Sequence, residues 1–300
     1  MDKLVILLIA AISLSAGCKQ SGTTSVAARK DTLENVRKGF RSALLARGNA
    51  PQEYSDQSPP DNVKEVRYRS GDLELNAWMS EVPIEGPKRP AVVYLHGGWA
   101  FSSSDWSDAA PFIDAGFVVF MPMLRAENGN PGIYEGFLGE IDDAIAAGKY
   151  VANLSHVDAN NVFLVGHSVG AVNVALASML PSDYRAAAAL SGYMELQDWP
   201  DSFPSAFVFD ISNEQEMRVR NPMNFPHSLL IPITLYAEKE NGPIDNNEMF
   251  ADLARKAGKK CDMVVVDGDH MTMVKPAASR AAEWFKAITM DENSETAIAR

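Results

Sequence analysis

The sequence predicts an α/β domain in which a mostly parallel sheet is covered by helices on both faces. Short, nearly unbroken apolar runs, typical of strands buried on both faces, lie at 91–95, 117–120, 162–165, 186–190, 233–236 and 263–266. Stretches that suit helices lie between and after these runs, at 105–115, 136–153, 168–180, 246–258 and 276–290. Because strands that alternate with helices pair in parallel through crossovers, this order predicts one such sheet.

Two segments depart from this alternation. Residues 63–68 and 73–78 alternate apolar and polar side chains on either side of a short turn, which predicts an antiparallel hairpin at the start of the sheet. Residues 192–228 are too many for a simple connection, and they carry aromatic side chains among prolines and acids. We expect this segment to form a lid insertion with a short helix near 210–219.

The composition bounds the class of protein. The chain has 300 residues, of which 46% are hydrophobic and 22% charged, and this suits one large globular domain or two small ones. Its 39 acidic and 27 basic residues give a formal net charge of −12. A nucleic-acid-binding protein needs a clustered basic face. The sequence lacks one, so we expect no nucleic-acid partner.

The N-terminus has the pattern of a secretory signal. Lys3 precedes a short apolar run at 4–12, and small residues lead from there to Cys18. The run is too short to span a bilayer comfortably as a permanent helix. Leu-Ser-Ala-Gly-Cys at its end resembles a bacterial lipobox, which implies cleavage before Cys18 and acylation of that cysteine. The alternative is an ordinary signal peptide cut near Ala16, which would leave Cys18 unmodified.

These features define the expected organisation of the chain. We expect a signal peptide at 1–17, a tether with a short helix (31–47) at 18–62, the α/β domain at 63–290 and a flexible tail at 291–300. By the rule for bacterial lipoproteins, Lys19 after the cysteine implies the outer membrane, on its periplasmic side or at the surface. The expected protein is therefore extracytoplasmic and contacts the membrane through a lipid anchor at Cys18.

The most informative stretch is 162–170, where an apolar run ends in Gly-His-Ser-Val-Gly and a stretch that suits a helix follows. The order of strand, sharp turn and helix places Ser168 at the turn, clear of the sheet. Gly166 and Gly170, two residues to either side, let the strand and the helix pack closely. This arrangement predicts a nucleophilic serine. The alternative is that Ser168 only caps the helix.

Acyl transfer by a serine also needs a base, an acid that orients the base, and donors for the oxyanion. Among the five histidines, His270 follows the run 263–266 and precedes a helix-like stretch. A loop at the carboxyl end of the last strand is where such a base belongs, so we expect His270 to take the proton of Ser168.

Three carboxylates after the penultimate expected strand are candidates for the acid: Glu238, Glu240 and Asp245. Glu238 lies very close to the strand end. Asp245, with Glu248 three residues later, is typical of a helix capping box. We favour Glu240 as the residue that fixes the tautomer of the histidine and stabilises its imidazolium.

The segment His96-Gly97-Gly98-Trp99, directly after the run 91–95, resembles the His-Gly-Gly motif of α/β-hydrolases. The resemblance implies an oxyanion hole with two backbone donors, the N–H of Val169 and an N–H of Gly98 or Trp99. His96 is then a structural residue that shapes the loop.

Residues 63–288 as a whole resemble the catalytic domain of the prolyl oligopeptidase family and the related α/β-hydrolase esterases. Segment 122–132 looks like the arginine-and-glutamate loop that follows a core strand in that family. The resemblance implies an α/β-hydrolase fold in which the serine, the histidine and an acid after the penultimate strand are catalytic. We expect Arg125 and Glu127 to form a salt bridge that braces the wall of the site. Family peptidases usually carry a large N-terminal β-propeller, and too few residues precede the first expected strand to form one.

The sequence therefore predicts a serine hydrolase that cleaves ester or amide bonds, peptide bonds included, through an acyl-enzyme intermediate. The alternatives are a carboxylesterase for small acyl esters and a non-catalytic binding lipoprotein of the same fold. Trp99, Phe101 and the aromatic residues of 199–209 are candidates to line a substrate pocket. The sequence has no metal-ligand cluster, phosphate-binding loop or nicotinamide fingerprint. We expect no metal and no cofactor, and a small molecule or peptide as the substrate.

Overall fold

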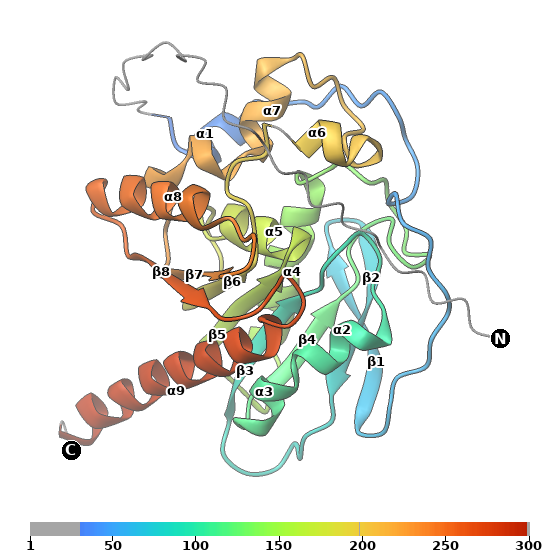
Figure 1. Cartoon of the computed structure of the whole chain (residues 1–300). Coiled ribbons are helices and arrows are strands. Elements are labelled where there is room, and N and C mark those ends of the chain that lie inside the picture. Colours follow the sequence, from blue (N-terminus) through green and yellow to red (C-terminus); the bar gives the residue numbers. More distant parts are fainter. Residues whose placement is uncertain (1–30, 198, 299–300) are drawn as a thin grey trace. The chain divides into compact units, whose positions relative to one another are not determined.

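The computed structural model describes residues 31–197 and 199–298, and this part of the chain forms an α/β domain (Figure 1). The strands of its central sheet are β1 (Val63–Ser70), β2 (Leu73–Ser80), β3 (Arg89–Leu95), β4 (Val118–Pro122), β5 (Val157–His167), β6 (Ala186–Leu190), β7 (Ile233–Glu238) and β8 (Cys261–Val266). Their order in the sheet is β1-β2-β4-β3-β5-β6-β7-β8. β2 runs antiparallel to β1 and β4, and the pairings from β4 to β8 are parallel.

Helices cover both faces of this sheet, as the sequence predicts. One face packs against α4 (Gly139–Ala152), α5 (Val169–Ala177) and α8 (Ile244–Lys256). The opposite face packs against α2 (Ser103–Asp108), α3 (Ala110–Asp114) and α9 (Val274–Ile298). Since successive side chains of a strand point to opposite faces, Val93 of β3 packs in the first layer and Val92 in the second. The predicted fold class and the antiparallel start of the sheet are confirmed.

Aromatic packing fixes the helix that follows the His270 loop. Phe163 of β5 and Phe285 of α9 stack with ring centroids 4.3 Å apart and an interplanar angle of 12°, and both side chains are fully buried. Burying a side chain of this kind contributes about 1.5–3 kcal/mol. Because β8 ends just before His270 and α9 begins just after it, the packed sheet and helix hold both ends of that loop.

The segment before β1 differs from the predicted tether. α1 spans Leu33–Lys38, because the chain leaves the helix at Gly39, whereas the sequence predicts a helix over 31–47. Leu33 is fully buried in the core on the α4 side of the sheet. Residues 31–62 therefore belong to the same compact unit as the sheet, and the predicted start of the domain at residue 63 is too late.

We call residues 41–58 the strap. It has almost no regular secondary structure and crosses the surface between α1 and β1 (blue in Figure 1). The N–H of Leu45 donates to the carbonyl of Val208 at 2.7 Å, and the N–H of Tyr134 donates to the carbonyl of Gly48 at 3.0 Å. The strap is thus held first by the lid insertion and then by the chain after β4.

The lid insertion, residues 192–228, contains α6 (Trp199–Ser202) and α7 (Glu214–Arg220), and short 3-10 turns at Pro204–Ala206, Pro222–Asn224 and Pro226–Ser228. α7 lies close to the helix predicted near 210–219. Glu216 and Arg220 form a buried ion pair within it, with 2.5 Å between Oε2 and Nη1. The second oxygen of Glu216 accepts the N–H of Ala43 at 2.6 Å, which joins the lid to the strap.

The C-terminal helix is longer than the sequence predicts. α9 continues to Ile298, so helix occupies most of the range 291–300 that we expected to be a flexible tail. The predicted signal peptide, Cys18 and residues 19–30 lie outside the described residues. Within the described part of the chain, no helix combines the length and the apolar character needed to cross a membrane.

Candidate active site

The carboxyl ends of the parallel strands meet at one edge of the sheet, where open α/β folds bind their ligands. Chemically capable side chains lie at or just beyond the ends of five strands. They are His96 after β3, Ser168 after β5, Ser191 after β6, Glu238 at the end of β7 and His270 after β8. Residues far apart in the sequence are thereby brought into one site.

Ser168 lies on a strained turn between β5 and α5, with φ 55° and ψ −114°. The flanking glycines make this turn possible. A Cβ atom on Gly166 would lie 2.5 Å from the carbonyl oxygen of Gly170, and a Cβ atom on Gly170 would lie 2.4 Å from that of Leu95. Any larger residue at either position would push the backbone apart. The predicted strand, turn and helix around Ser168 are therefore present, and its side chain stays partly exposed.

A chain of hydrogen bonds starts at this serine. His270 Nε2 lies 3.1 Å from Ser168 Oγ, and Nδ1 of the same ring lies 3.2 Å from Glu238 Oε1. Nδ1 also lies 2.6 Å from the hydroxyl oxygen of Ser191. Because an ionised carboxylate can only accept, Nδ1 carries the proton. Nε2 then has a free lone pair that faces the hydroxyl of Ser168.

The carboxylate beside His270 is Glu238, and the preference for Glu240 is corrected. β7 ends at Glu238 and the chain turns at the next residue, Lys239. This turn carries Glu240 to the exposed surface, where its N–H donates to the carbonyl of Gly268. The third candidate, Asp245, is exposed in the first turn of α8.

Glu238 is suited to face a positive charge. Its side chain is only 4% exposed. Burial raises the pKa of Glu238, but the hydrogen bonds from His270 and Ser191 outweigh burial and hold that pKa below its usual value. The carboxylate is therefore ionised near neutral pH, as an acid that orients a histidine must be.

The loop predicted to form the oxyanion hole lies against the serine. A Cβ atom on Gly97 would lie 3.6 Å from Ser168 Cβ, and Gly98 has φ +69°, a value that favours glycine. The structure therefore brings the loop that carries Gly98 and Trp99 beside Ser168. Val169 adjoins the serine as the first residue of α5, and the first N–H groups of a helix have no partner within it.

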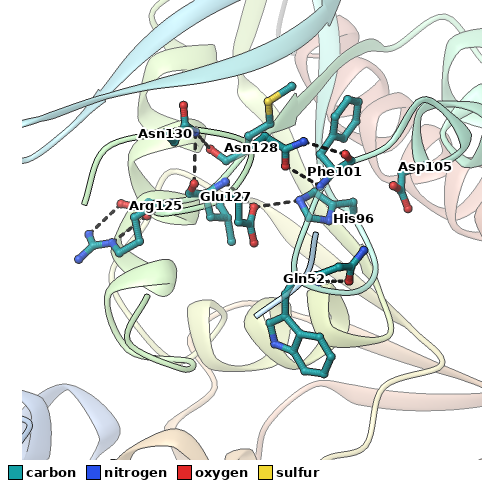
Figure 2. A network of polar contacts seen from close by, with 12 residues as sticks. Gln52, His96, Phe101, Asp105, Arg125, Glu127, Asn128 and Asn130 are labelled. Carbon is teal, nitrogen blue, oxygen red and sulfur yellow. Dashed lines mark hydrogen bonds and ion pairs between the residues drawn. The ribbon is translucent and has the colours of Figure 1, made fainter. Parts of the chain in front are cut away.

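His96, at the start of this loop, is buried and points toward Glu127 (Figure 2). Its Nε2 lies 3.0 Å from Glu127 Oε2, and its Nδ1 lies 3.0 Å from the carbonyl oxygen of Gly97. Both ring nitrogens thus face acceptors, so both carry protons. Burial lowers the pKa of His96, but the charge and hydrogen bond of Glu127 outweigh burial and raise that pKa to about 9.

The loop after β4 braces the oxyanion loop. Asn128 holds Phe101 through two hydrogen bonds, accepting its N–H at 2.8 Å and donating to its carbonyl at 2.9 Å (Figure 2). The predicted salt bridge between Arg125 and Glu127 is wrong. Arg125 pairs with Asp143 of α4 at 2.8 Å, whereas Glu127 pairs with His96.

His167 connects the serine turn to the loop of the base. It is buried, and burial together with the nearby His270 lowers the pKa of His167 to about 4. The ring is therefore neutral. Its Nε2–H donates to the carbonyl of His270 at 3.1 Å.

Half-buried aromatic rings lie beside the oxyanion loop. The Trp99 and Phe203 rings are 5.5 Å apart, Phe203 and Trp199 are 5.6 Å apart, and Trp199 and Tyr193 are 6.1 Å apart. This cluster offers an apolar wall for part of a substrate. Phe101 does not belong to it, because its ring packs against Trp78 in the core.

The described residues contain no group of three or more His, Cys, Asp or Glu side chains arranged to hold a metal ion. Cys261 is buried at the start of β8, and burial raises its pKa to about 12. It is therefore a protonated thiol and not a nucleophile.

Comparison with known proteins agrees with this geometry. A model described as the prolyl oligopeptidase family matches residues 103–289, which include the serine, the histidine and the carboxylate. The chain belongs to the prolyl oligopeptidase family. No curated protein sequence matches it.

The solved structures similar to this family member include both peptidases and esterases. An acylaminoacyl peptidase of Pyrococcus horikoshii is 17% identical with a TM-score of 0.60, and the match covers 76% of this chain and 40% of that one. An esterase of Pyrobaculum calidifontis is 18% identical with a TM-score of 0.62, covering 77% and 87%. A thermostable carboxylesterase from a metagenomic library, EstE1, is 17% identical with a TM-score of 0.63, covering 77% and 90%. These likenesses confirm the α/β-hydrolase fold, and the chain spans less than half of the peptidase.

Sequence reasoning missed Ser191 and Gln52. Ser191 has one signal, its position directly after the run 186–190, because the end of a parallel strand points to the site. Gln52 has none, since the strap carries no motif. Gln52 Oε1 accepts the N–H of Trp99 at 2.9 Å (Figure 2).

Glu127→Gln should destabilise the protein in a pH-dependent way. The pKa of His96 is raised to about 9 in the folded protein, from the ordinary histidine value of 6.5. Stability from the raised pKa is therefore fully present below pH 6.5 and is lost as the pH rises through 9. Removing the carboxylate should cost about 3 kcal/mol at pH 6, and the loss should shrink above pH 9. Thermal unfolding of both proteins across this range measures it, and a difference independent of pH would contradict the charge of His96.

Proposed function

We propose that this protein is a serine hydrolase that cleaves ester and amide bonds through an acyl-enzyme intermediate on Ser168. The observation that carries the proposal is the hydrogen-bonded chain from Ser168 through His270 to Glu238, with the serine on a strained turn. Membership of the prolyl oligopeptidase family supports it. A non-catalytic binding protein would have no need of an ionised carboxylate, an oriented imidazole and a partly exposed serine in one line.

The first step is attack by Ser168 Oγ on the carbonyl carbon of the substrate. His270 Nε2 takes the hydroxyl proton, and Glu238 stabilises the imidazolium through Nδ1–H. The same Nε2–H then protonates the leaving alkoxide or amine as the tetrahedral intermediate collapses. Water repeats the sequence on the acyl-enzyme, with His270 as the base, and releases the acid.

The negative charge on the substrate oxygen needs backbone donors. We assign this role to the N–H of Val169 and to an N–H of Gly98 or Trp99, which the loop after β3 holds beside the serine. Removing one donor of this kind typically costs about 10²–10³ in rate. The buried charge of His96 fixes the loop, so these donors need no reorganisation during the reaction.

The proposal extends to the type of bond, amide or ester, that the enzyme cleaves. The similar structures include an acylaminoacyl peptidase and esterases, and the half-buried rings beside Trp99 suit an apolar acyl or side-chain group. We propose peptide or other amide bonds first and small acyl esters as the alternative. Hydrolysis of proline- or alanine-linked amides supports the first, and turnover of short-chain nitrophenyl esters without amide cleavage supports the second.

A fluorophosphonate should label the wild-type protein at Ser168 and should not label Ser168→Ala. Labelling that persists in Ser168→Ala would refute the nucleophile.

Glu238→Gln should lower kcat by about 10³–10⁴-fold, because the imidazolium loses its counter-charge. Glu240→Gln is the matched control and should keep near-normal kcat, since Glu240 is exposed and lies beyond the turn after β7. A larger loss in Glu240→Gln than in Glu238→Gln would refute the assignment of the acid.

We further propose that a lipid on Cys18 anchors the enzyme to the membrane outside the cytoplasm. The basic start, the apolar run and the Leu-Ser-Ala-Gly-Cys ending support this localisation. The wild-type protein should sediment with membranes, with processing that globomycin blocks. Cys18→Ser should be released into the soluble extracytoplasmic fraction. A Cys18→Ser protein that stays on the membrane would contradict the anchor.

A further inference from the structure

We propose that the hydroxyl of Ser191 is a positioning residue of this site, which links His270 to Glu238 and holds the imidazole in line with Ser168. The inference rests on the proposed function. It extends the site from three side chains to four.

The distances put Ser191 between the base and the acid. Ser191 Oγ lies 2.6 Å from His270 Nδ1, whereas Glu238 Oε1 lies 3.2 Å from the same nitrogen. Because Nδ1 carries the proton, Ser191 Oγ accepts a hydrogen bond from Nδ1–H. The hydroxyl proton of Ser191 is then free to be donated in a second hydrogen bond. Ser191 also hydrogen-bonds the carboxylate of Glu238. The path therefore runs from Nδ1–H to the hydroxyl oxygen, and from the hydroxyl proton to the carboxylate.

Glu238 has few other donors. Its Oε2 is buried and has no hydrogen-bond partner among the described residues, and its Oε1 faces His270 Nδ1. Without the hydroxyl, His270 would be the remaining side-chain donor to the carboxylate, at the longer distance of 3.2 Å. When the imidazolium forms, Ser191 stays neutral and transfers no proton. It keeps the ring oriented and relays the charge of Glu238.

The backbone at this position does not itself require serine. Ser191 follows β6, is 1% exposed and has φ 54°. Its N–H donates to the carbonyl of Tyr236 on β7 at 2.7 Å, which places the hydroxyl beside the end of that strand. A positive φ favours glycine. A hydroxyl held at this strained position is therefore explained by what it contacts.

Ser191→Ala and Ser191→Gly separate the hydroxyl from the backbone. Both should lower kcat by about 10–100-fold, the effect of losing a hydrogen bond to a charged group, and leave KM nearly unchanged. Ser191→Gly should unfold at the wild-type temperature or above, because glycine relieves the positive φ. The low-field proton resonance of His270 Nδ1–H should shift in both variants.

The outcomes are distinct. Wild-type kcat in Ser191→Ala, or recovery of kcat in Ser191→Gly alone, would overturn the positioning role while Ser168 is still labelled by a fluorophosphonate. Absence of labelling in the wild-type protein would overturn the proposed function and this role together.

The strap carries an independent observation at the oxyanion loop. Gln52 Oε1 lies 2.9 Å from the N of Trp99 and 2.6 Å from the position of a Cβ atom on Gly98. A carboxamide oxygen is the same kind of acceptor as the carbonyl oxygen of an amide or ester substrate. From this placement, and resting on the proposed function, we infer that Gln52 occupies the site of the substrate carbonyl, so the strap is autoinhibitory.

The strap is held in a way that permits local withdrawal. Gln52 and its neighbours 53–56 are exposed. On one side, the N–H of Ala50 donates to the carbonyl of Ala126 at 3.0 Å, and on the other, Gln57 Oε1 accepts the N–H of Ser103. A substrate carbonyl can therefore replace Gln52 while the two ends of the strap stay attached.

Gln52→Ala should raise the rate of fluorophosphonate labelling and kcat/KM by about 2–10-fold, the range of one neutral hydrogen bond. Gln57→Ala is the matched control: it removes a similar contact of the strap with a backbone N–H outside the oxyanion loop, and it should leave both rates unchanged. A Gln52→Ala protein labelled at the wild-type rate or more slowly would overturn the inference. An equal rise in Gln57→Ala would also overturn it, because loosening of the whole strap would then suffice.

Discussion

The close approach of Gly170 to the end of β3 is the constraint on which the site depends. A Cβ atom at Gly170 would lie 2.4 Å from the carbonyl oxygen of Leu95. This contact places α5, and with it the strained Ser168, directly beside the loop that follows Leu95. A strained residue of this kind costs about 1–3 kcal/mol, which the burial of β5 and α5 offsets. This one close contact therefore sets the positions of both the nucleophile and the oxyanion loop.

The polar groups around this contact are braced by a second loop. Glu127 holds His96 at the start of the oxyanion loop, and Asn128 holds Phe101 just beyond its end. Each interaction joins the chain after β4 to the chain after β3. Donors fixed in this way stabilise a developing charge without moving, which is where much of the catalytic effect of such sites arises. The charge of His96 thus acts on the reaction through the backbone of the loop.

The sequence predicts the parts of the site that follow from local pattern. Ser168 and His270 lie at the carboxyl ends of apolar runs, and the structure brings them to 3.1 Å. The acid was harder to predict, because the choice between Glu238 and Glu240 depends on the residue at which β7 ends and the chain turns. Ser191 and Gln52 depend on tertiary placement, which a motif does not encode. The strands, in contrast, were predictable from local pattern, because strands buried on both faces leave continuous apolar runs in the sequence.

The central claim is that Ser168 forms a covalent acyl-enzyme, and trapping that species tests it most directly. Brief exposure to a slowly hydrolysed nitrophenyl ester, followed by acid quenching and peptide mass spectrometry, should show one acyl group on the peptide that contains Ser168. The adduct should disappear with time as water completes the cycle, and nitrophenolate should be released in an initial burst. Ester hydrolysis with no adduct on this peptide, or with the adduct on another residue, would contradict the account.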